Sequence, residues 1–170
     1  MSDDLTPVIA ASARWLLAAY PAPAGALNRA LAEAQARQAA ALAAALRYPT
    51  GLDVQLLHLL APGGSHPLDW LTGCDPHPDD HAWRTWVDET VVSWAACLLA
   101  DPALATRAHQ ALKKAEHGSE AVGLQRLTDP GDRDYEAAVL LRHPDLLENV
   151  AGLHRHQLME LLSGDGAGLR

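Results

Sequence analysis

The sequence predicts an all-α protein, folded as an antiparallel helical bundle with additional short helices. Alanine and leucine dominate the 170-residue chain, and both favour helix. β-branched residues are sparse and cluster mainly at Val91–Val92. Apolar residues recur at helical spacing, and no stretch shows a strand pattern. We expect one domain over residues 1–170, with residues 163–170 as a frayed tail.

Three helices are expected before the first glycine-rich stretch. Thr6 can cap the first helix, Pro7 suits its first turn, and Trp15 faces the core. The third helix is short and apolar, Leu52–Ala61, and a Pro-Gly-Gly sequence ends it. The second helix, Leu27–Arg47, is rich in alanine and has a predicted inner face at helical spacing. This face consists of Leu27, Leu31, Ala34, Gln38, Leu42, Ala45 and Leu46.

The longest irregular stretch runs from Pro62 to Pro78 and contains three glycines and four prolines. A single helical turn around Pro67–Leu71 is expected within it. Loops carry binding and catalytic residues more often than the scaffold does, so this stretch is a candidate functional segment.

A central helix is predicted over Asp80–Ala100, with Asp79 or Asp80 as its N-cap. Its apolar and aromatic residues recur at helical spacing, and we interpret this stripe as core. The stripe consists of Trp83, Trp86, Val87, Thr90, Val91, Trp94, Cys97 and Leu98.

Shorter helices are expected between the central helix and the last one. In the third of them, Tyr135, Val139 and Leu140 are expected to face inwards. The first begins at Asp101-Pro102 and ends at Gly118, and the other two run over residues 120–127 and 133–142.

The C-terminal helix Pro144–Gly164 has the clearest boundaries, with proline in its first turn and glycine at its end. At about 100° per residue, His154 falls in the middle of its apolar stripe and His156 on the opposite side. A buried imidazole needs partners for its N–H group and its lone pair. His154 is therefore a hydrogen-bonded core histidine or else a metal ligand or proton carrier, and His156 is a surface residue.

Composition excludes several classes of protein. The net charge of −8 argues against nucleic acid as a main partner, because such binding needs a basic face. No run approaches 18 apolar residues and no secretory signal is visible, so we expect no membrane partner. Cys74 and Cys97 form no CxxC motif, which favours a reduced, cytoplasmic chain. No glycine-rich phosphate loop or nucleophile elbow is present, so no nucleotide cofactor is expected, and whether the protein is an enzyme stays open.

The chain contains nine histidines, and one group of them has metal-ligand spacing. His77 and His81 form an HxxxH motif with two aspartates between them. On a helix both imidazoles would share a face and could chelate a metal ion. Pro78 instead indicates that His77 precedes the helix, and the two aspartates are then better explained as N-caps.

A second histidine group resembles the DinB/YfiT-like family of four-helix-bundle proteins. The segments Leu56-Leu57-His58-Leu59-Leu60 and Val150–Leu158 are similar to its two histidine segments. The resemblance implies a divalent metal, nickel, zinc or iron, held by His58 and His154. His154 and His156 would point about 160° apart on a helix, so both cannot ligate one ion without distortion. The third ligand stays open, and the site is either complete or degraded. The alternatives for this ligand are His81, His66, Asp69 and His156.

Two other motifs resemble the NarJ/TorD-like chaperones of molybdoenzymes, which are also all-helical. Leu16-Leu17-Ala18-Ala19-Tyr20-Pro21 is similar to their opening segment, and His77-Pro78-Asp79-Asp80-His81 to their loop motif. This resemblance implies an interaction protein without catalysis, in which Asp80 and His81 help to hold the signal peptide of a partner. The expected partner under this hypothesis is another protein, and a homodimer is a further alternative.

Overall fold

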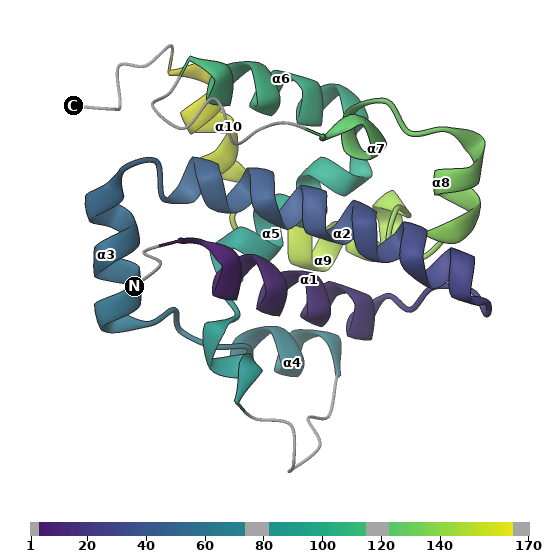
Figure 1. Ribbon diagram of the computed structural model, residues 1–170, viewed down its shortest axis with the longest axis horizontal. Coiled ribbons are helices and arrows are strands. Elements are labelled where there is room, and N and C mark those ends of the chain that lie inside the picture. The colour runs from purple at the N-terminus through teal and green to yellow at the C-terminus, as the bar shows by residue number, and fades with distance from the viewer. Residues whose placement is uncertain (1–3, 74–81, 115–122, 165–170) are drawn as a thin grey trace.

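The computed structural model describes residues 4–73, 82–114 and 123–164, and these residues form helices and no strand. The all-α prediction is therefore confirmed, and the helices pack against one another (Figure 1). His77, Asp79, Asp80 and His81 lie outside the described residues, as does the end of the predicted tail. The elements are α1 (Thr6–Ala19), α2 (Ala26–Arg47), α3 (Gly51–Leu60), α4 (His66–Thr72), η1 (Trp83–Trp86), α5 (Glu89–Ala100), α6 (Pro102–Lys113), α7 (Gln125–Thr128), α8 (Asp132–Ala137), α9 (Pro144–Ala151) and α10 (Arg155–Ser163).

Helix α2 is the centre of the fold, because it packs against α1 and α5 and also contacts α6, α7 and α8 (Figure 1). Its buried face differs from the predicted one, since Leu27 is 54% exposed and the helix buries mainly alanines. Small side chains let helix axes approach closely, and alanines line this contact where leucines were predicted. The buried residues of α2 are Ala32, Gln35, Ala36, Ala39, Ala40, Leu42, Ala43, Ala44 and Ala45.

The predicted central helix begins later than expected, at Glu89 instead of Asp80. Asp88 is the actual N-cap, because its Oδ1 accepts hydrogen bonds from the backbone N–H groups of Thr90 and Val91 at 2.9 and 3.1 Å. Val87 is extended, with φ −70° and ψ 127°, and this residue separates α5 from η1. Tyr48 donates a hydrogen bond to the other Asp88 oxygen, and burial together with this carboxylate raises the pKa of the Tyr48 phenol.

The predicted C-terminal helix is broken into α9 and α10 between Ala151 and Arg155. Side chains of α5 form hydrogen bonds with backbone groups at the break. Ser93 Oγ donates to the Ala151 carbonyl oxygen at 3.1 Å and accepts from His154 N at 2.9 Å. Trp94 Nε1 donates to the His154 carbonyl oxygen at 2.9 Å. The break is therefore a tertiary feature that α5 stabilises.

An ion pair spans the same break. Arg155 of α10 donates two hydrogen bonds to the Glu148 carboxylate of α9, at 2.9 and 2.8 Å. These bonds lower the pKa of Glu148. The two hydrogen bonds connect the two short helices across the break.

The predicted helix over residues 133–142 is shorter, since α8 ends at Ala137. Its predicted inner face is wrong, because Tyr135, Val139 and Leu140 are 43%, 51% and 39% exposed. The chain leaves the helix after Ala137, so the helical period no longer decides which side chains face inwards. Residues Ala137, Ala138, Leu141 and Arg142 are buried instead.

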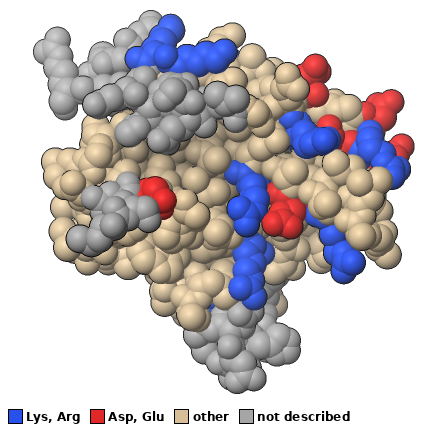
Figure 2. Space-filling view, viewed as in Figure 1, with Lys and Arg blue, Asp and Glu red and all other residues tan. Residues whose placement is uncertain are grey.

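Charged side chains are unevenly distributed over the surface. Figure 2 shows basic and acidic side chains gathered on the right of the molecule, over α7 and α8, while the left edge at α3 is mostly uncharged. Among the described residues, none of the helices combines the length and the apolar character that crossing a membrane requires.

Replacing Ala39, which is fully buried on α2, tests the close packing of this helix. We expect Ala39→Leu to lower the free energy of unfolding by about 1–3 kcal/mol, because the extra atoms overpack the contact. Ala30→Leu is the matched control, since Ala30 is exposed on the same helix and both residues are good helix formers. Urea unfolding measures both changes, and equal stability of the two variants would contradict close packing at Ala39.

Candidate functional site

The two histidines predicted to share a metal have different neighbours. His58 is half-buried on α3, where its Nε2 lies 2.8 Å from the Asp4 carbonyl oxygen. Its ring centre lies 5.5 Å from the Trp86 ring centre. His154 lies at the break before α10, and its Nε2 is 3.4 Å from Glu89 Oε2. Its side chain is 24% exposed, so it is less buried than the helical period predicted.

The other predicted ligands lie in separate surroundings. His156 is 86% exposed and pairs with Glu160 at 3.0 Å, which confirms the prediction that it faces solvent. His66 is exposed at the start of α4. In the part of the chain that the structure describes, no group of three His, Cys, Asp or Glu side chains could hold a metal ion. Metal binding by His58 and His154 stays a prediction.

Asp69, another predicted ligand, is the centre of a buried hydrogen-bonded cluster. Its Oδ1 accepts from Trp15 Nε1 at 2.8 Å and from Arg84 Nη1 at 2.9 Å. Its Oδ2 accepts from the Ser65 hydroxyl at 2.7 Å. These bonds connect α1, α4 and η1, and they occupy both oxygens of the carboxylate. The geometry therefore explains Asp69 as a residue that anchors α4.

The anchored helix α4 exposes a tryptophan. Trp70, next to Asp69, has 82% of its surface exposed. It lies in the stretch from Pro62 to Pro78 that the sequence marks as a candidate functional segment. A large aromatic side chain on a fixed helix is typical of protein-binding surfaces.

Helix α3 exposes most of its leucines. Only Val54 and Leu57 of this helix are buried, each 5% exposed. Its remaining leucines lie at spacings of four, three and one residues and form the exposed surface that we call the α3 leucine surface. It consists of Leu52, Leu56, Leu59 and Leu60, which are 65%, 45%, 80% and 78% exposed. The spacing of apolar residues predicts this leucine-rich helix. It does not predict which leucines are exposed, because that depends on which other helices cover them.

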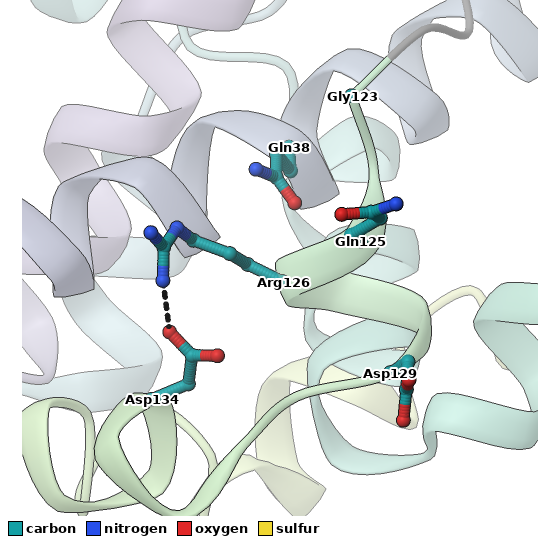
Figure 3. A pocket seen from close by; sticks show the side chains of 6 residues that line it. All are labelled: Gln38, Gly123, Gln125, Arg126, Asp129 and Asp134. Atoms are coloured by element: carbon teal, nitrogen blue, oxygen red, sulfur yellow. Dashed lines mark hydrogen bonds and ion pairs between the residues drawn. The ribbon is translucent and has the colours of Figure 1, made fainter.

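A polar cavity of about 310 Å³ lies between α2, α7 and α8 (Figure 3). Arg126 Nη1 donates to Asp134 Oδ1 at 2.8 Å across it. Gln38 of α2 accepts a hydrogen bond from Leu127 N at 3.1 Å. Sequence reasoning missed this cavity, because no local motif connects residues that are 89 positions apart. The lining residues are Gln38, Gly123, Gln125, Arg126, Asp129 and Asp134.

A buried guanidinium lies next to the cavity walls. Arg142, which is 4% exposed, donates from Nε to Gln35 Oε1 at 2.7 Å and from Nη1 to the Leu99 carbonyl oxygen at 3.3 Å. It also donates to the Arg126 carbonyl oxygen. Gln35 Nε2 donates to the Asp134 carbonyl oxygen at 2.9 Å. Burial lowers the pKa of Arg142. Its acceptors connect α2, α5 and α7, and Gln35 extends these contacts to α8.

Comparison with protein-family models, with curated proteins and with solved structures finds no match to this chain. The DinB/YfiT-like and NarJ/TorD-like resemblances therefore rest on the quoted motifs alone.

Replacing Asp69 tests its role as an anchor. We expect Asp69→Ala to lower the free energy of unfolding by about 3 kcal/mol, because it leaves the Arg84 guanidinium buried without its carboxylate. The control is Glu33→Ala, which removes an exposed ion pair to Arg37 and should cost less than about 0.5 kcal/mol. Urea unfolding followed by circular dichroism measures both, and an Asp69→Ala variant as stable as the control would contradict the anchor.

Proposed function

We propose that this protein is a non-catalytic interaction protein, a chaperone or adaptor that holds an apolar helical segment of another protein on the α3 leucine surface. The observation that carries the proposal is the exposure of Leu52, Leu56, Leu59 and Leu60, which lies between 45% and 80%. Single exposed leucines are ordinary, but a cluster on one helix is typical of a binding surface.

The energy available from this surface supports the proposal. Fully burying one leucine side chain is worth about 1.5–3 kcal/mol. Most of this free energy is still available at Leu59 and Leu60, because these side chains are 80% and 78% exposed. A partner that covers them gains affinity from apolar burial without any charged contact.

Helix α3 is already formed in the unbound protein. Thr50 and Asp53 make a reciprocal capping box, with Asp53 N donating to Thr50 Oγ1 at 3.2 Å and Thr50 N donating to Asp53 Oδ2 at 3.0 Å. Leu57 of the same helix packs into the core. Since the helix is ordered before binding, the binding free energy is not reduced by the entropy of ordering it.

The size of α3 favours a helical segment of a partner over a second copy of this chain. The helix has ten residues and is therefore about 15 Å long. A stable dimer buries roughly 800 Å² on each subunit, and two such short helices cannot supply that area by themselves. A partner helix that lies along α3 matches its length and can extend beyond it towards other exposed residues.

The resemblance to NarJ/TorD-like chaperones supports the same class of function from the sequence. The exposed Trp70 adds an aromatic contact residue in the stretch from Pro62 to Pro78, the candidate functional segment of the sequence. Asp80 and His81, the residues that the resemblance itself implies, are part of the proposal as partner-binding residues.

A labelled synthetic peptide tests the proposal directly. The probe is an amphipathic helix of about 18 residues with leucines at positions i, i+3, i+4 and i+7. We expect saturable binding by fluorescence anisotropy, and the double variant Leu56→Glu/Leu59→Glu should weaken it by at least about tenfold. The physical reason is that each glutamate places a charge where the partner's apolar face must lie.

Leu27→Glu is the matched control, because Leu27 is also an exposed leucine, 54% exposed, in the first turn of α2. Helix α2 begins on the opposite side of the molecule from α3 (Figure 1). This variant should bind the peptide as the wild-type protein does. Equal peptide affinities of the wild-type protein, the double variant and the control would contradict the proposal. Concentration-dependent self-association that the double variant abolishes would assign the surface to a second copy instead.

A further inference from the structure

We propose that the polar cavity between α2, α7 and α8 binds an uncharged amide group, either a carboxamide of a small molecule or a peptide unit. This site is separate from the α3 leucine surface and does not depend on it. Gln38, Gln125 and Arg126 carry the assignment. The cavity volume of about 310 Å³ is at the lower end of the range for small-molecule sites.

The orientation of the Gln38 amide is fixed by the backbone. Its Oε1 accepts the hydrogen bond from Leu127 N at 3.1 Å, so its Nε2 must be the atom that is available to a ligand. Gln38 Nε2 has no hydrogen-bond partner among the described residues. Gln38 therefore offers a ligand two donors, which suit a carbonyl oxygen.

Gln125 offers both a donor and an acceptor. It is exposed at the start of α7, and within the described ranges no hydrogen bond to its side chain exists. Figure 3 shows the Gln38 and Gln125 side chains on the same side of the Arg126 side chain, with the Gln125 oxygen turned towards Gln38, the Gln38 nitrogen turned away from Gln125 and Asp129 apart from both. An amide ligand that lies across the Gln38 side chain can accept from Gln38 Nε2 and donate to Gln125 Oε1.

The charges of the cavity favour a neutral ligand over an ion. Asp134 is already satisfied, because Oδ1 accepts from Arg126 at 2.8 Å and Oδ2 accepts from Gly131 N at 3.0 Å. Asp129 adds a second carboxylate against the single guanidinium of Arg126, so an anion would meet net negative charge. A cation would meet the N–H groups of Gln38 Nε2, which are donors and cannot coordinate it.

The walls of the cavity are held from inside the protein. Gln35 Nε2 donates to the Asp134 carbonyl oxygen at 2.9 Å, and Arg142 binds the Arg126 carbonyl oxygen. Both residues are buried. The two residues that form the ion pair across the cavity are therefore positioned by backbone contacts, which lowers the cost of ordering the site when a ligand binds.

Titration of the ¹⁵N-labelled protein with N-acetylglycinamide tests the proposal. We expect saturating shifts of the Gln38 and Gln125 side-chain amide resonances, with a dissociation constant of about 10 mM or lower. Gln125→Ala should weaken binding by about tenfold, and Gln38→Glu should do the same while keeping the oxygen that accepts from Leu127 N. Gln110→Ala is the matched control, because Gln110 is exposed on α6 and should leave binding unchanged.

A capped triglycine probe distinguishes the two sources of the amide. Tighter binding of triglycine than of N-acetylglycinamide assigns the site to a peptide chain, and equal or weaker binding assigns it to small carboxamides. The proposal is overturned if no saturation occurs up to about 100 mM. It is also overturned if Gln125→Ala and Gln110→Ala bind equally well, or if sodium acetate saturates the same resonances with equal affinity.

Discussion

The alanine-lined contact of α2 with α1 and α5 is the constraint on which the rest of the structure depends. Because Ala36, Ala39 and Ala43 are fully buried, the neighbouring helices can lie close to α2. This position of α5 then determines where Ser93 and Trp94 meet the C-terminal segment and bind the break between α9 and α10. Gln35 lies on the same face of α2 and holds Arg142, so the same helix also organises the buried polar contacts.

The same packing explains why α3 keeps an apolar outer side. Helices α1, α2 and α5 pack on one another and form the body of the protein. Among the described residues, α3 makes only sparse contacts with the other helices. Val54 and Leu57 attach it to the body, and four leucines remain outside. The capping box keeps this helix formed without a partner. A stable body that carries a preformed apolar helix is a suitable architecture for holding another protein's helix.

Local signals predicted the parts of the fold that local chemistry decides. Pro7 marks the first turn of α1, although the N-cap is Leu5 and not the predicted Thr6, and the proline and glycines after α3 mark its end. The sequence places the start of α5 too early, because several aspartates could be its N-cap. Only the hydrogen bonds that Asp88 accepts in the folded protein identify the actual N-cap. The break before His154 depends on Ser93, 61 residues away. The exposure of Leu59 and the polar cavity likewise depend on tertiary packing, which no periodicity contains.

Hydrogen exchange of the free protein tests the division between a tightly packed body and an uncovered α3 most directly. Amides of buried, well-packed helices exchange only through global unfolding, while helices with few buried contacts open locally. We expect the slowest exchange in α2 and α5 and clearly faster exchange in α3, at a protein concentration where the chain is monomeric. Protection of α3 equal to that of α2 would contradict the account, because the four leucines would then be covered.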